Sequence, residues 1–148
     1  MVGLVELRLY NNQLTALPDS LGQLINLREL HLQNNILRDL PMSLGGMRSL
    51  RHLNLSGNRL AHLPDSLGEL AQLRQLDLRN NRLQELPATL GNATNLTHLD
   101  LRGNKLRTLP ASLAALPQLE KLDLRWNKLI GEHPWLHELE RHGCVVLR

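Results

Sequence analysis

The side chains of this chain that could do chemistry are histidine, cysteine and a set of Asp and Arg residues. A zinc ion could be ligated near the C terminus by four residues that follow one another closely: His133, His137, His142 and Cys144. Zinc needs three or four ligands that converge, and the expected helix stop at Gly143 does not bring these together. His137 and His142 are five residues apart instead of the four of a zinc-protease helix, so they lie on different faces. We expect no metal and no cofactor.

Covalent and acid–base catalysis have no better support in the sequence. No combination of nucleophile, base and orienting acid is suggested by the spacing of the residues. The glycines stand singly, unlike those of a phosphate-binding loop. The sequence therefore predicts that the chain is not an enzyme.

The densest polar cluster lies in LDLRNNRLQELPATLG, from Leu76 to Gly91, and near-copies occur upstream as LHLQNNILRDLPMSLG and downstream as LDLRGNKLRTLPASLA. A fixed period takes precedence over any segment-by-segment interpretation. The period is 23 residues, and four leucine columns, which start at Leu4, Leu7, Leu9 and Leu14, recur without exception through six repeats. Three further columns are Asn12, Asn35, Asn58, Asn81, Asn104, Asn127; Pro18, Pro41, Pro64, Pro87, Pro110; and Gly22, Gly45, Gly68, Gly91, with Ala114 in fifth place.

This pattern, LxxLxLxxNxLxxLPxxLGxLxx, resembles the leucine-rich repeat family, in the 23-residue intracellular form seen in Ras-pathway scaffolds and in many bacterial proteins. The resemblance covers essentially the whole chain. It implies an α/β solenoid shaped like a horseshoe, with a parallel sheet of six or seven short strands on the concave face and short helical or irregular segments on the convex face. It also implies a scaffold for protein binding, as in signal transduction.

The physical chemistry of one repeat agrees with this fold. Leu76-Asp77-Leu78 alternates apolar and polar residues, as a strand with one buried face does. Proline then starts a short helical turn, and glycine is expected where the chain reverses tightly. The asparagine amide can satisfy backbone groups where the strand bends away. Because one repeat cannot bury its leucines alone, we expect a single domain, 1–148, with repeats that start at residues 4, 27, 50, 73, 96 and 119.

The two ends of the array differ. Residues 131–148 are expected to form a C-terminal cap, with a helix from His133 to Gly143 and a seventh strand in which Val145 and Leu147 continue the columns of Leu122 and Leu124. Cys144 then points outward, as a reactive surface thiol or as an edge residue under the cap. At the other end, Leu4, Leu7 and Leu9 are expected to form an open edge.

The outward strand positions form two columns on the concave face. One column is Arg8, His31, Asn54, Asp77, Asp100 and Asp123, and the other is Tyr10, Gln33, Ser56, Arg79, Arg102 and Arg125, which Arg148 continues. The Asp and Arg ladders either neutralise each other or dock a partner of complementary charge, and the two roles are compatible. Tyr10 and Trp126 are candidate anchors, although Trp126 could instead pack on the cap. A basic line, Arg59, Arg82, Lys105 and Lys128, is interpreted as a solvated rim.

The charge balance and the absence of targeting signals narrow the function. The net charge of +3 comes from 17 basic and 14 acidic residues, so we expect neither a nucleic acid nor a membrane as partner. One cysteine, no signal peptide and no long apolar run predict a cytoplasmic protein. The leading hypothesis is a module that binds a protein partner on the concave face. The alternative is a structural spacer or a solenoid that forms a weak homodimer through its N-terminal edge.

Overall fold

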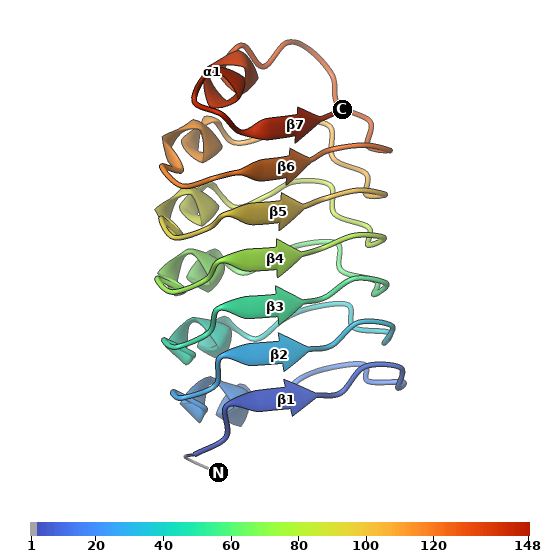
Figure 1. The fold of residues 1–148 in the computed structure, drawn as a ribbon. Coiled ribbons are helices and arrows are strands. Elements are labelled where there is room, and N and C mark those ends of the chain that lie inside the picture. Colours follow the sequence, from blue (N-terminus) through green and yellow to red (C-terminus); the bar gives the residue numbers. More distant parts are fainter. Residues whose placement is uncertain (1–2) are drawn as a thin grey trace.

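The computed structural model is a stack of similar coils, from the N terminus at the bottom of Figure 1 to the C terminus at the top, in which strands form one layer and short helical turns form the other. It describes residues 3–148, so the first two residues of the expected 1–148 domain lie outside the described residues. The strands are Glu6–Arg8 (β1), Glu29–His31 (β2), His52–Asn54 (β3), Gln75–Asp77 (β4), His98–Asp100 (β5), Lys121–Asp123 (β6) and Val145–Leu147 (β7). The helical segments are the 3-10 turns Asp19–Gln23 (η1), Met42–Gly46 (η2), Asp65–Glu69 (η3), Ala88–Asn92 (η4) and Ala111–Ala115 (η5), and the α-helix Trp135–Arg141 (α1).

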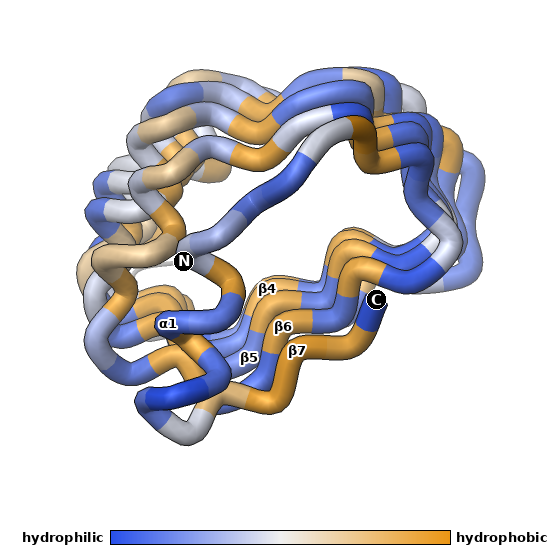
Figure 2. Tube along the Cα trace, turned by 90° about the horizontal axis from the view of Figure 1, so that it is seen from above, coloured by the Kyte–Doolittle hydropathy of each residue, from blue (hydrophilic) through white to orange (hydrophobic). Residues whose placement is uncertain are grey.

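The seven strands form one parallel sheet in sequence order, from β1 to β7. From β1 to β6 each residue pairs with the residue 23 positions later, as Leu76 does with Leu99. Figure 2, which looks along the stack, shows hydrophobic and hydrophilic segments of successive coils lying over one another. The sequence columns are therefore physical columns, and the expected solenoid with a parallel sheet is confirmed.

The core is almost entirely leucine and runs the length of the array. Leu30, Leu53, Leu76 and Leu99 are at most 2% exposed, and the leucine that directly follows each of these strands is fully buried. The first repeat is different, because Leu4, Leu7 and Leu9 are only partly buried. Among the described residues β1 pairs with β2 alone, so the expected open N-terminal edge is present there.

The asparagine column connects neighbouring repeats through the backbone. The Asn81 amide nitrogen donates to the carbonyls of Leu55, in the preceding repeat, and Leu78, at 2.9 and 3.1 Å. Its Oδ1 accepts the backbone N–H of Leu60 at 3.0 Å. Each of the asparagines from Asn35 to Asn127 makes the same three bonds. Each side chain therefore satisfies three backbone groups that two coils leave unpaired.

Proline and glycine shape the opposite layer, but the expected role of the glycine column is wrong. Each 3-10 turn is preceded by its proline in extended conformation, such as Pro64 with φ −69°. The glycines of the column do not have positive φ. A Cβ at Gly68 would instead lie 2.1 Å from the carbonyl oxygen of Thr89 in the next turn. Glycine is needed there because successive turns pack backbone against backbone, and not because the chain reverses.

The C-terminal cap has the expected helix and seventh strand, but the register of that strand is shifted by one residue. Leu122 pairs with Val146, 24 residues later, so the expected match of Val145 to Leu122 and Leu147 to Leu124 is wrong. Val145 is 54% exposed and Val146 packs on the core. The extra residue accompanies the replacement of a five-residue 3-10 turn by the longer α1.

The same shift changes the two residues that flank the cap strand. Cys144 is 5% exposed instead of outward, and burial, followed by the charge of Glu140, raises the pKa of its thiol. A raised pKa disfavours the thiolate, so the expected surface reactivity is not supported. Arg148 does not continue the arginine column, because its guanidinium binds Glu140 at 2.7 Å. Within residues 3–148, no helix has the length and apolar character needed to cross a bilayer.

Candidate functional site

The outward Asp and Arg residues of β4, β5 and β6 form one hydrogen-bonded network on the sheet face. In each strand an Asp and the Arg two residues later point to the same side, because side chains alternate along a strand. The Asp77 carboxylate accepts hydrogen bonds from Nε and Nη2 of Arg79 at 2.9 and 2.7 Å. The same fork recurs between Asp100 and Arg102, and between Asp123 and Arg125.

The forks are also linked from strand to strand. Arg79 Nε lies 3.6 Å from Asp100, and Arg102 Nε lies 3.2 Å from Asp123. Arg79 and Arg102 thus each stand between two carboxylates, so the stacked aspartates do not repel one another without compensation. The expected neutralisation of the two ladders is what the geometry shows.

Asp123 is the most buried charge of this network, with 1% of its side chain exposed. Burial alone raises the pKa of a carboxyl group, but here the side-chain and backbone hydrogen bonds from Arg125 and the charge of Arg102 outweigh it. The pKa of Asp123 is therefore below its ordinary value. For each arginine the hydrogen bond to the Asp of its own strand raises the pKa, so the pairs remain ionised.

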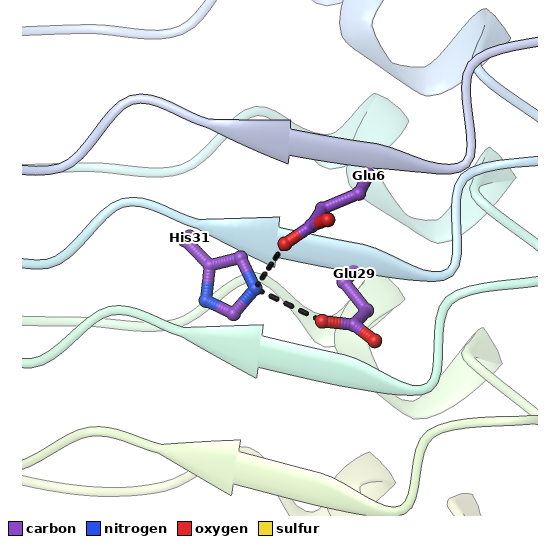
Figure 3. A group of neighbouring side chains, drawn as sticks. All are labelled: Glu6, Glu29 and His31. Carbon is purple, nitrogen blue, oxygen red and sulfur yellow. Dashed lines mark hydrogen bonds and ion pairs between the residues drawn. The ribbon is translucent and has the colours of Figure 1, made fainter.

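The N-terminal half of the sheet face carries a smaller cluster that the sequence columns did not reveal (Figure 3). His31 Nε2 lies 3.1 Å from a carboxylate oxygen of Glu29 and 3.5 Å from one of Glu6, on the neighbouring strand. Arg8 Nε donates to the same Glu6 oxygen. Glu6 and Glu29 belong to a third outward column, and the 23-residue period places one opposite the other. The 23-residue period is therefore the sequence feature from which the proximity of Glu6 and Glu29 could have been predicted.

Glu6, Glu29 and His31 also form the only group of three potential metal ligands within the part of the chain that the structure describes. Their ligand atoms lie within 4.8 Å of one another, but Arg8 already engages the Glu6 oxygen nearest His31. The hydrogen bonds and opposite charges account for the cluster without an ion. The cap residues His133, His137, His142 and Cys144 do not converge in this way, since Cys144 is buried and His137 contacts Glu140.

The remaining expected site residues lie on the same face with fewer contacts. Ser56 donates its hydroxyl to Asn54 Oδ1 at 2.8 Å, which repeats in neutral form the Asp–Arg contact of the later strands. Gln33 has its Oε1 buried without a partner among the described residues. Tyr10 is 41% exposed. The structure thus brings the two predicted columns together on one face.

A column of left-handed backbone conformation follows each of the first six strands, and sequence reasoning missed it. Its members are Asn11, Asn34, Gly57, Asn80, Gly103 and Trp126, with φ between 54° and 67°. Asn and Gly are the residues that adopt this conformation most readily, and five of the six positions hold them. The Asn and Gly column was therefore the signal for this turn.

Trp126 is the exception in that column. A bulky residue in the left-handed region costs about 1–2 kcal/mol relative to glycine. Burial does not offset this cost, because the side chain is 73% exposed. The ring contacts the Arg125 guanidinium, which lies 5.7 Å from the ring centroid. The alternative that Trp126 packs on the cap is therefore wrong, and the tryptophan that packs on the core is Trp135.

The basic line lies just beyond this turn. Arg59, Arg82, Lys105 and Lys128 are held in register by backbone hydrogen bonds to the preceding repeat. Their side chains make no hydrogen bond or ion pair with any of residues 3–148. Lys105 and Lys128 border a shallow hollow that Arg107 and Ile130 also line. The line is thus a solvated rim, as expected, and its charges are unpaired.

Comparison with known proteins shows which family and which solved structures this chain resembles. A leucine rich repeat model matches residues 2–60, 26–83 and 71–129, and no curated protein matches the chain. A leucine-rich repeat protein of Leptospira interrogans is similar, with 40% identity and a TM-score of 0.91 over 97% of this chain and 36% of that one.

Two plant receptor structures are also similar. The ectodomain of the Arabidopsis thaliana receptor kinase GASSHO1/SCHENGEN3, in complex with CASPARIAN STRIP INTEGRITY FACTOR 2, is 38% identical, with a TM-score of 0.82 over 90% of this chain and 17% of that one. The plant peptide hormone receptor RGFR1, in complex with RGF2, is 30% identical, with a TM-score of 0.71 over 86% and 25%. The chain spans well under half of each of these three proteins. The family-model matches cover most of its length, and the chain belongs to the leucine-rich repeat family.

Proposed function

We propose that the chain is a non-enzymatic module that binds a protein partner on its sheet face. The observation that carries this proposal is the placement of its aromatic side chains. The chain has one tyrosine, two tryptophans and no phenylalanine. Two of these three aromatic residues, Tyr10 and Trp126, are exposed just beyond the ends of strands. Exposed aromatic side chains are the commonest anchors of protein interfaces.

The sheet face between these two residues supplies the rest of the surface. We assign partner contacts to the outward residues of the six repeats: Arg8, Tyr10, His31, Gln33, Asn54, Ser56, Asp77, Arg79, Asp100, Arg102, Asp123, Arg125 and Trp126. The Asp–Arg network is already paired within the protein, so its contribution is to orientation and selectivity more than to affinity. The family supports this proposal, since the two plant receptors were solved in complex with peptide or protein ligands.

Affinity capture of partners with the purified chain tests the proposal. We expect the change of Tyr10→Ala together with Trp126→Gly to remove most captured partner, because anchors of this kind each contribute about 2 kcal/mol or more. Met42→Ala is the matched control, since Met42 is an exposed apolar residue of η2, in the opposite layer. Equal capture by the double variant and the control would reject the sheet face as the docking surface.

A second candidate role is self-association through β1. Among the described residues, β1 pairs with β2 alone and leaves its other edge open, and Val5 beside it is 48% exposed. An open strand edge next to apolar side chains favours pairing with another chain. Light scattering over a concentration series should then show a dimer that Val5→Lys weakens. A monomer at all concentrations would exclude this role and leave the first proposal intact.

The cytoplasmic location expected from the sequence is part of the first proposal. It rests on the single cysteine, which cannot form an internal disulfide. Microscopy of the tagged chain in its own cell tests it.

A further inference from the structure

We propose that the corner where β6 ends, formed by Arg125, Trp126, Lys105 and Lys128, binds an acidic peptide segment of the partner. A carboxylate of that segment would pair with Arg125, and a neighbouring apolar side chain would lie on the Trp126 ring. The inference rests on the proposed protein-binding function and gives the chemistry of one part of that surface.

The first argument is that the fold does not need tryptophan at position 126. The same turn is made by asparagine or glycine in every earlier repeat, where these residues fit the left-handed backbone. Trp126 contributes little burial, because 73% of it is exposed. A residue that is unfavourable for the backbone and unburied indicates a functional constraint.

The second argument is that the ion-pair network ends at Arg125. Arg79 and Arg102 each contact two carboxylates, one on their own strand and one on the next. Among residues 3–148, Asp123 is the only carboxylate that Arg125 contacts, because β7 places Leu147 opposite Asp123. Arg125 thus keeps guanidinium N–H groups available to an acid from another chain.

The third argument is the charge of the loops that follow β5 and β6. Lys128 follows Trp126 by two residues, and Lys105 holds the equivalent position one repeat earlier. Neither side chain has a partner among the described residues. The anion of this corner, Asp123, is already shared by Arg102 and Arg125. The corner therefore carries unbalanced positive charge beside an apolar ring.

An acidic peptide fits this corner better than a nucleic acid does. Single-stranded nucleic acids bind where several aromatic rings stack on successive bases along a basic groove. The positions before Trp126 in the same column are Gly103 and Asn80, so no second ring is available there. Arg125, Lys105 and Lys128 can pair with a few carboxylates, and the single ring of Trp126 can pack against one apolar side chain.

Fluorescence polarisation with short labelled peptides tests the inference. The probe is a peptide in which glutamates flank one phenylalanine. In two control peptides, every glutamate is replaced by glutamine or by lysine. We expect the glutamate peptide alone to bind, and salt to weaken it. Trp126→Gly and Arg125→Gln should each reduce its affinity about tenfold. Arg48→Gln, at an exposed arginine beyond η2 in the opposite layer, is the matched control and should leave the affinity unchanged.

The outcomes separate this inference from the proposed function. Absence of binding by the glutamate peptide, or equal binding to Trp126→Gly, would overturn the corner as an acid-binding site. Oligothymidylate that binds more tightly than the peptide and depends on the same two residues would also overturn it, in favour of a nucleic acid. In all these cases the proposed function would still be supported by partner capture that the Tyr10 and Trp126 double variant loses and Met42→Ala keeps, and equal capture by these two would reject it. Circular dichroism of each variant shows that the fold is retained.

Discussion

Trp126 is the residue at which stability and binding are expected to oppose each other. Trp126→Asn places a residue that tolerates the left-handed backbone, as at Asn80, in the same turn. The change removes a strain of about 1–2 kcal/mol and the exposed contact with Arg125, worth about 0.5–1 kcal/mol. We expect the free energy of unfolding in urea to rise by about 0.5–1 kcal/mol, while partner capture falls. Asn80→Gly is the control and should be close to neutral. A loss of stability in Trp126→Asn would show that the ring supports the fold.

Asp123 should make stability depend on pH. Its pKa is lowered in the folded chain, so the unfolded chain binds the proton more readily, and the ionised form stabilises the fold above the unfolded pKa of about 4. This contribution is lost as the pH falls through the folded pKa. We expect Asp123→Asn to cost about 1–3 kcal/mol near pH 7, and the difference from the unchanged chain to shrink in acid. Urea unfolding at several pH values measures it. Asp65→Asn, at an exposed carboxylate of η3, is the control and should change the free energy of unfolding at pH 7 only slightly.

At the scale of the element, the asparagine column connects each coil to its neighbours. Asn81→Ala leaves the Leu60 N–H and the carbonyls of Leu55 and Leu78 without their side-chain partner in a buried place. Each buried group left unpaired costs about 1–3 kcal/mol, so we expect a loss of about 3 kcal/mol or more in chemical denaturation.

Asn12→Ala provides the comparison for that prediction. Asn12 is exposed and bonds only to carbonyls of its own repeat, at Leu9 and Tyr10. Its loss should cost about 1 kcal/mol or less. Equal losses at the two positions would mean that the bonds between repeats do not carry the stabilisation.

The elements differ in how far their sequence determines them. The leucine and asparagine columns predict strands and stacking because repetition leaves one register that buries all leucines. The cap strand could not be placed, because Val145, Val146 and Leu147 are all apolar and alternate in neither register. The pairing of Asp with Arg was expected, whereas the cluster of Glu6, Glu29 and His31 depends on side-chain directions across two strands. The left-handed turn after each strand could have been predicted from the Asn and Gly residues of its column. The tryptophan at the sixth position made that column harder to recognise.

At the scale of the whole molecule, stability should depend on the position of a repeat in the array. Leu76 is 1% exposed and has coils on both sides, so Leu76→Ala should cost about 3–5 kcal/mol through lost burial and a cavity. Leu7 is partly buried because no described coil covers β1. Leu7→Ala should therefore cost roughly half as much. Thermal and urea unfolding compare the two, and equal costs would contradict a stability that is summed over neighbouring repeats.

The separation of paired residues, which is 24 at the last strand pair and 23 at the others, also limits where repeats can be added to such a gene. Duplication of a 23-residue unit anywhere before β6 would add a coil whose leucines, asparagine and proline fall in phase with both neighbours. The same insertion between β6 and β7 would separate α1 from the one strand interval that accommodates it. Length variation among related genes should therefore occur in multiples of 23 codons upstream of the cap, with the cap segment inherited as a unit.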